Sequence, residues 1–161
     1  MDQNLRRYRY LLEKVDALGL PIEIKTTQLD GVTRKRREVW VDNVRCYFST
    51  TSSSTKGPLS SKSYWQFAFE PKEVDKCHIF IAQATQFYGG AGVMYSVPDF
   101  FVALVSELPE SYRSNRRDRV TFHVPIDNYS VNSRKSKVLF NWWNHRQDWD
   151  QLFKLFYANR A

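Results

Sequence analysis

The apolar positions near the N-terminus recur at helical spacing and then change to alternation. The helical stretch covers residues 2–18 and ends at Gly19. Its apolar face comprises Leu5, Tyr8, Leu11, Leu12, Val15 and Leu18. Alternation then predicts a strand over residues 21–28, and two further strands over 38–51 that fold back after Asp42 in an Asp-Asn turn. This part of the chain therefore predicts one helix followed by three strands.

Later in the chain, short apolar runs alternate with polar or glycine-rich turns. Such runs are typical of strands, and the most continuous of them are typical of strands buried on both faces. The predicted strands cover residues 63–71, 77–84, 92–98 and 120–126, with a flexible glycine turn over 85–92.

Three helical segments complete the pattern. Pro71 is well placed at the first position of a short helical turn, and Asp99 is the predicted N-cap of a helix over residues 99–112. The third, an aromatic amphipathic helix, begins near Asn141 and closes the chain. Its large apolar side chains predict one broad face, buried in the core or against a second copy of the chain. This face comprises Trp142, Trp143, Trp149, Leu152, Phe153 and Phe156.

The order of these elements predicts a mixed α/β fold, with a central mixed β-sheet flanked by N-terminal, middle and C-terminal helices. The 161 residues suffice for one hydrophobic core, and the chain has no internal repeat and no long linker. We therefore expect a single domain over residues 1–161. A hydrophobic content of 42% and an aromatic content of 16% exclude an intrinsically disordered chain.

A formal net charge of +7 makes a polyanion the natural partner, and we expect nucleic acid rather than a membrane. No apolar run is long enough to cross a bilayer, and the N-terminus has no apolar signal core. These two features predict a cytoplasmic location. Cys46 and Cys77 are then expected to be reduced and buried.

The positive charge is concentrated in turns and loops, where binding residues often project from a rigid sheet. Arginine and lysine neutralise phosphates, and nearby hydroxyls and amides add hydrogen bonds. A single such cluster is more typical of a solvated surface, but three in one small domain favour binding. The candidate nucleic-acid-binding residues are Arg34, Lys35, Arg36 and Arg37, then Lys56 and Lys62 around the Ser/Thr loop 49–57, then Arg113, Arg116, Arg117 and Arg119. The third basic cluster, after those at 34–37 and 113–119, holds Arg134, Lys135 and Lys137. The candidates for base stacking are Tyr112, Trp142 and Trp143.

Three phrases in the middle of the chain occur in a suggestive order: "YWQF" (64–67), "DKCHIFIA" (75–82) and "YSVP" (95–98). This order resembles the core of the PD-(D/E)xK nuclease superfamily, whose members have the restriction-endonuclease-like fold. The resemblance implies a Mg²⁺-dependent endodeoxyribonuclease that hydrolyses phosphodiester bonds. Members of the family hold the metal with one acidic residue and with an acidic-x-Lys pair on the next strand. That pair is missing from the expected strand, "VRCYFSTT" (44–51).

Candidate catalytic and metal-binding residues lie between positions 23 and 42. Glu23 and Lys25 form an acidic-x-Lys pair on one face of a predicted strand, and Asp42 stands near the position of the family's first acid. Asp42, Asp30 and Glu38 would be the metal ligands if the chain is catalytic. Alternatively, Glu23 and Lys25 belong to the solvated face of an amphipathic strand, and Asp42 is simply part of the hairpin turn.

Three functions remain open on the sequence alone. The first is a nucleic-acid-binding protein of nuclease-like fold, with DNA favoured over RNA, that could also be a hydrolase using Mg²⁺. The second is a non-catalytic subunit that keeps the sheet and the basic loops, which the missing acidic-x-Lys pair favours. The third is a protein-interaction domain that uses the aromatic C-terminal helix, with a homodimer as one form of it.

Overall fold

Five strands form the central sheet in a computed structural model that describes residues 7–28, 35–50, 64–84, 87–88, 94–95, 98–114, 116–125 and 140–158. They are β1 (Ile22–Gln28), β2 (Lys35–Val41), β3 (Val44–Thr50), β5 (Ile79–Ala84) and β8 (Asp99–Leu104). The order across the sheet is β1-β2-β3-β5-β8. β3 and β5 run parallel, and the other neighbouring pairs are antiparallel. The predicted mixed sheet is confirmed.

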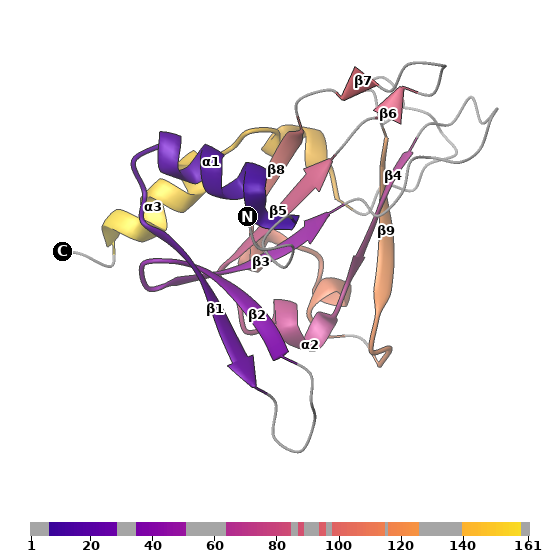
Figure 1. The fold of residues 1–161 in the computed structure, drawn as a ribbon. Helices are drawn as coiled ribbons and strands as arrows, with labels where there is room; N and C mark the ends of the chain where they lie inside the picture. Colours follow the sequence, from indigo (N-terminus) through magenta and orange to yellow (C-terminus); the bar gives the residue numbers. More distant parts are fainter. Residues whose placement is uncertain are drawn as a thin grey trace.

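Two further layers cover this sheet (Figure 1). The helices α1 (Arg9–Ala17) and α3 (Asp150–Ala158) lie on one face. The other face carries α2 (Pro71–Val74) and a second, two-stranded sheet of β4 (Tyr64–Phe69) and β9 (Val120–Pro125). Alternate residues of the central strands therefore enter two separate hydrophobic cores, as the period of two requires. The arrangement is a mixed α+β fold, as predicted.

The N-terminal elements follow the sequence pattern closely. Leu11 and Val15, one helical turn apart, are fully buried under α1, and Gly19 leaves the helix with a φ of +78°, a conformation that glycine adopts without strain. The β2–β3 hairpin turns at Asp42, whose φ is +53°. Aspartate tolerates this left-handed conformation better than most residues, which suits a two-residue hairpin turn.

The helix predicted over residues 99–112 is wrong. Residues 99–104 form the edge strand β8, followed by the short 3-10 helices η2 (Val105–Glu107) and η3 (Glu110–Tyr112). Phe100 faces the core under the helices, whereas Phe101 faces the core under β4 and β9. A strand buries both faces of such an apolar run, and aromatic and β-branched residues favour it. The phrase "YSVP" (95–98) of the nuclease resemblance is thus followed by a strand and not by the predicted helix.

The C-terminal segment is not one helix beginning near Asn141. It starts with the 3-10 helix η5 (Trp142–His145), passes the sheet edge at the Phe101–Arg146 bridge, and enters α3 only at Asp150. Gln147, with a φ of +52°, breaks the helix between the two parts. Trp142 is consequently buried in the core under β4 and β9, and Trp149 in the core under α1 and α3. The single broad apolar face predicted for this segment is wrong.

Two short strands, β6 (Phe87–Tyr88) and β7 (Met94–Tyr95), pair where a glycine turn and a longer strand over 92–98 were predicted. The rest of that prediction falls outside the described residues, as does most of the Ser/Thr loop 49–57. Within the described part of the chain, no helix is long and apolar enough to span a membrane.

Candidate functional site

A cleft opens where β2 and β3 separate. The two strands pair only from Val39–Cys46 to the hairpin turn, because β2 continues along β1 as far as Lys35 while β3 continues along β5 as far as Thr50. The space between the diverging strands has a volume of about 470 Å³. Strand divergence, a property of the backbone register, thus creates the cleft.

Charged side chains from five parts of the chain surround this cleft. The arginines are Arg7, Arg37, Arg45 and Arg119, and the acids are Glu38, Glu70, Glu73 and Asp118. Arg7 lies just before α1, and its Nη2 donates a hydrogen bond of 3.3 Å to the carbonyl of Phe48, in the part of β3 that β2 has left. The Arg7 guanidinium therefore contacts the β3 backbone at a position where β2 no longer pairs with it.

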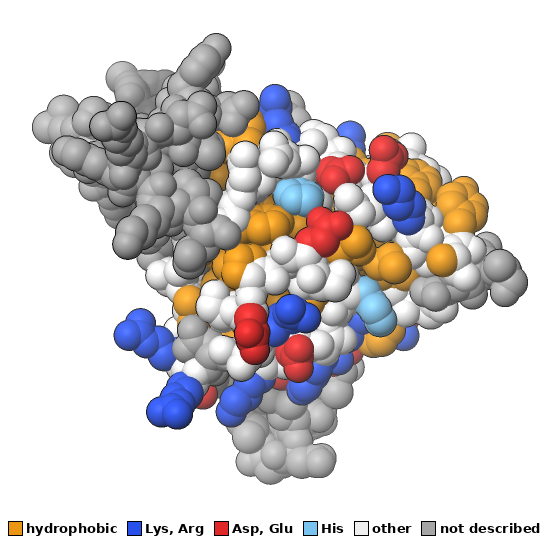
Figure 2. Space-filling view, turned by 180° about the vertical axis from the view of Figure 1, so that it is seen from behind, with side chains coloured by type: hydrophobic (Ala, Val, Ile, Leu, Met, Phe, Trp, Pro, Cys, Tyr) orange, Lys and Arg blue, Asp and Glu red, His pale blue; other side chains and the backbone are white. Residues whose placement is uncertain are grey.

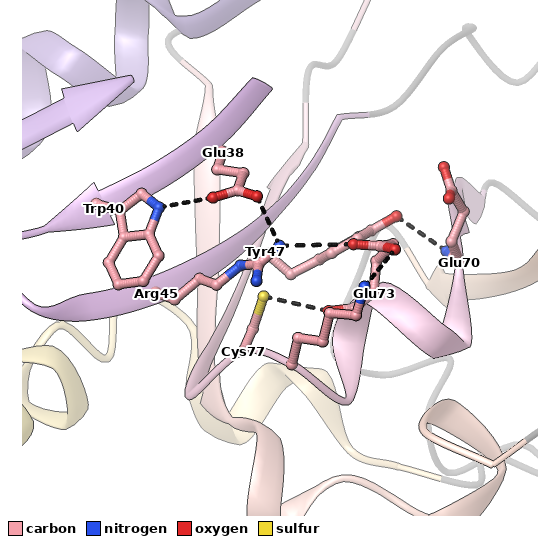
Figure 3. A network of polar contacts seen from close by, with 8 residues as sticks. Glu38, Trp40, Arg45, Tyr47, Glu70, Glu73 and Cys77 are labelled. Carbon is pink, nitrogen blue, oxygen red and sulfur yellow. Dashed lines mark hydrogen bonds and ion pairs between the residues drawn. The ribbon is translucent and has the colours of Figure 1, made fainter. Parts of the chain in front are cut away.

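Arg45 is the centre of the polar network in the wall of the cleft (Figure 3). Its Nη2 lies 3.0 Å from Glu38 Oε1 and 3.5 Å from Glu73 Oε2. Only 18%, 18% and 13% of the side chains of Arg45, Glu38 and Glu73 are exposed. Trp40 Nε1 donates to Glu38 at 3.0 Å, and Lys76 Nζ lies 3.2 Å from Glu73. Two cations thus neutralise two largely buried carboxylates, which burial would otherwise destabilise.

Tyr47 and the two cysteines lie beside this network and remain protonated near neutral pH. Desolvation by burial raises the pKa of Tyr47 to about 12, and its hydroxyl accepts a hydrogen bond of 2.9 Å from the backbone N–H of Glu70. Burial likewise raises the pKa of Cys77 to about 11 and the pKa of Cys46 still further. Both thiols are free and buried, as predicted. As protonated groups they are poor nucleophiles.

The candidate catalytic residues lie on or near the outer face of the β1–β2 pair. Glu23 and Lys25 are exposed, on the strand face opposite the buried core, and they pair across the ladder with Trp40 and Glu38. Lys25 Nζ lies 4.4 Å from the centroid of the Trp40 ring, a cation–π contact. Asp42 is exposed in the hairpin turn, and Asp30 falls outside the described residues.

These positions do not fit a magnesium centre of the nuclease type. Glu38 already accepts from Arg45 and Trp40, and Asp42 stands beyond Trp40 at the far end of β2. Across the residues that the structure describes, no three His, Cys, Asp or Glu side chains are arranged to hold a metal ion. Arg45 comes from β3, the strand on which the predicted nuclease resemblance expects the acidic-x-Lys pair, and its guanidinium contacts the carboxylates of Glu38 and Glu73.

The structure brings two of the predicted basic clusters together. Arg37, near the start of β2, and Arg119, from the loop before β9, line the same cleft. Arg116 and Arg117 are exposed in that loop, and Arg113 is half-buried. Lys35, Arg36 and Arg37 belong to β2, where their backbones pair with β1, so the prediction that this basic run lies in a turn is wrong for these three residues. Figure 2 shows lysine and arginine side chains gathered along its lower edge. Arg34, Lys56, Lys62 and the third basic cluster fall outside the described residues.

Two of the three proposed base-stacking residues are enclosed in the core. Tyr112 is 4% exposed and stacks on Phe69 with ring centroids 4.8 Å apart, and Trp142 stacks on Phe122 at 5.1 Å. Neither ring has a face free for a base, so base stacking is wrong for Tyr112, whereas the burial predicted for Trp142 from its aromatic neighbours is confirmed. Trp143 is half-buried, edge-on to Phe101.

Arg7, Arg45 and Glu73 carry no role in the sequence-based prediction. A signal for Arg45 does exist, since it is a charged residue inside an otherwise apolar strand pattern and faces away from Val44 and Cys46. Arg7 and Glu73 have no comparable local signal, because tertiary packing alone brings them to the cleft. Comparison of the chain with protein-family models, curated proteins and solved structures gives no match.

Proposed function

We propose that this chain is a nucleic-acid-binding protein that contacts phosphates through the arginine-lined cleft. The observation that carries this proposal is the convergence of Arg7, Arg37 and Arg119, from three distant parts of the sequence, on one cleft. Guanidinium groups bind phosphate oxygens through paired, charge-assisted hydrogen bonds. The preference for DNA over RNA rests on the resemblance to the nuclease superfamily.

The charge balance around the cleft is compatible with a phosphate ligand despite its four acids. Arg45 and Lys76 lie within ion-pair distance of Glu38 and Glu73, so these two carboxylates are compensated within the protein. The lining also holds the acids Glu70 and Asp118 together with three further arginines, Arg7, Arg37 and Arg119. Arg116 and Arg117 are exposed in the adjoining loop.

Binding without hydrolysis is the form that the geometry supports best. A nuclease of the family would need carboxylates available to a divalent ion, whereas Glu38 and Glu73 are engaged by Arg45. The protein-interaction alternative has less support, because Trp149, Leu152 and Phe156 of the C-terminal segment are buried within the chain itself. A homodimer through this face would need the helix to leave its core.

The test is the salt dependence of binding to a labelled DNA duplex, followed by fluorescence anisotropy. Each phosphate contact contributes about −0.9 to the slope of log Kobs against log salt concentration. The double variant Arg37→Ala/Arg119→Ala should therefore flatten the slope by about two. Lys154→Ala, which removes one exposed cation from α3 on the opposite face of the sheet, is the control and should leave the slope unchanged. An unaltered slope in the double variant would remove the cleft from the binding surface.

A further inference from the structure

The lining of the cleft is chemically mixed, which a bare phosphate backbone does not require. Arginines can hold a phosphate, but the carboxylates of Glu70 and Asp118 would only repel it. Carboxylates accept hydrogen bonds, so they suit a ligand that also presents N–H or O–H donors. The bases of nucleic acids carry such donors on their edges, and in a duplex most of them are engaged in base pairs.

The size of the cleft also favours a ligand that is smaller than a duplex. A volume of about 470 Å³ lies in the range of small-molecule sites and is far too small for a double helix. A single nucleotide that has left the stack can enter a pocket of this kind, where its base is read by hydrogen bonds and by contact with apolar or aromatic side chains. Tyr47, which is half-buried, supplies aromatic surface in the same wall.

We infer that the cleft receives one unpaired nucleotide, with its phosphate toward Arg7, Arg37 and Arg119 and its base toward Glu70 and Asp118. The inference rests on the proposed function and narrows its ligand to single-stranded ends, gaps or mismatched positions. A continuous duplex would then bind only through its backbone, at the rim of the cleft.

The first test compares the affinity of the protein for a single strand, a duplex with an unpaired overhang and a blunt duplex of the same sequence, at one salt concentration. The unpaired nucleotide should raise the affinity about tenfold, the order of one good base contact. Equal affinity for the blunt and the overhanging duplex would overturn the inference but leave the proposed function standing. Absence of binding to all three would overturn both.

The isosteric double variant Glu70→Gln/Asp118→Asn should affect the affinities for a blunt duplex and for a substrate with an unpaired nucleotide differently. Both side chains are exposed, so we expect the variant to fold, which circular dichroism checks. Loss of two negative charges should tighten binding of the blunt duplex and reduce or abolish the preference for the unpaired substrate. An equal gain for both substrates would mean that these carboxylates act only as charges, and would overturn the inference.

Small probes separate base recognition from simple anion binding. We expect deoxyadenosine monophosphate to raise the Tm of the protein more than inorganic phosphate does at the same concentration and ionic strength. The difference should disappear in Glu70→Gln/Asp118→Asn. Equal shifts for the two probes in the unmodified protein would show an anion site without a base pocket, contrary to the inference.

Discussion

Arg45 on β3 and Glu38 on β2 meet at 3.0 Å, next to the last paired residues before the two strands separate. The same guanidinium reaches Glu73 on α2 at 3.5 Å. The contact therefore links three elements at the closed end of the cleft. Trp40, opposite Arg45 in the ladder, holds the second oxygen of Glu38. Because these groups are largely buried, their pairing matters for stability as well as for the charge of the cleft.

Arg45→Met should reduce the free energy of unfolding by about 3–5 kcal/mol, because it leaves two largely buried carboxylates without their shared cation. Urea denaturation measures the change. The exposed pair of Arg9 and Glu13, 3.3 Å apart on α1, supplies the control, and Arg9→Met should change stability by no more than about 1 kcal/mol. Adding Glu38→Gln to Arg45→Met should recover part of the loss. A loss as small as that of the control would mean that water solvates the network.

The buried thiols predict a fall in stability at alkaline pH. The thiol of Cys77 ionises near 9.0 in its ordinary state and near 11 in the folded protein, so between these values the unfolded chain binds fewer protons than the folded one. Stability must therefore decrease as the pH rises through this interval. Cys46 acts in the same direction, and Tyr47 does so above its ordinary pKa of 10.0.

Cys77→Ala tests this account by removing one of the contributing groups. Its free energy of unfolding should decrease less steeply between pH 9 and pH 10 than that of the unmodified protein, before Tyr47 contributes. Denaturation curves recorded across this range give the slope. An identical slope in the two proteins would show that Cys77 ionises in the folded state at its ordinary pKa.

Trp142 and Trp149 should contribute to stability independently, since they are buried in separate cores on opposite faces of the sheet. Trp→Ala at either position should cost about 3–5 kcal/mol. The milder Trp→Phe changes allow a double variant, whose effect should be the sum of the two single effects within about 0.5 kcal/mol. Tyr157→Ala, at a ring that is 62% exposed, is the control with little expected effect. Strong coupling between the tryptophans would be inconsistent with two separate cores.

The parts of the fold that could be predicted are those that local chemistry determines. The Asp42 turn, the helix stop at Gly19 and the proline-led turn at Pro71 each follow from the conformational preference of one residue. The segment after Asp99 could not be assigned locally, because an apolar run buried on both sides fits a helix or a strand equally well. Only its ladder with β5 decides for the strand.

The site was harder to predict because it depends on strand divergence and on long-range packing. Arg37 and Arg119 were recognised as basic residues, but nothing in the sequence places them beside one cleft. Trp142 and Trp149 have the spacing of one helical face, yet the turn at Gln147 sends them to opposite sides of the sheet. Periodicity predicts which side chains are buried, and tertiary contacts determine in which core.

We expect the protein not to hydrolyse DNA in the presence of Mg²⁺. With Glu38 and Glu73 held by Arg45, we expect Mg²⁺ to produce no more strand breaks in supercoiled DNA than a chelator does, at protein concentrations that saturate binding. Asp42→Asn should leave DNA affinity unchanged or slightly higher, because it removes an exposed negative charge. Lys25→Ala should leave the fold intact, since its side chain is exposed on the outer face of β1, and Glu23→Gln, its neighbour on that face, should behave likewise. Mg²⁺-dependent nicking that disappears in Asp42→Asn would instead establish a carboxylate centre that includes Asp42, at the β2–β3 turn. That result would favour a nuclease over a non-catalytic binding protein. It would not decide whether the cleft binds phosphates, which the salt-dependence experiment tests separately.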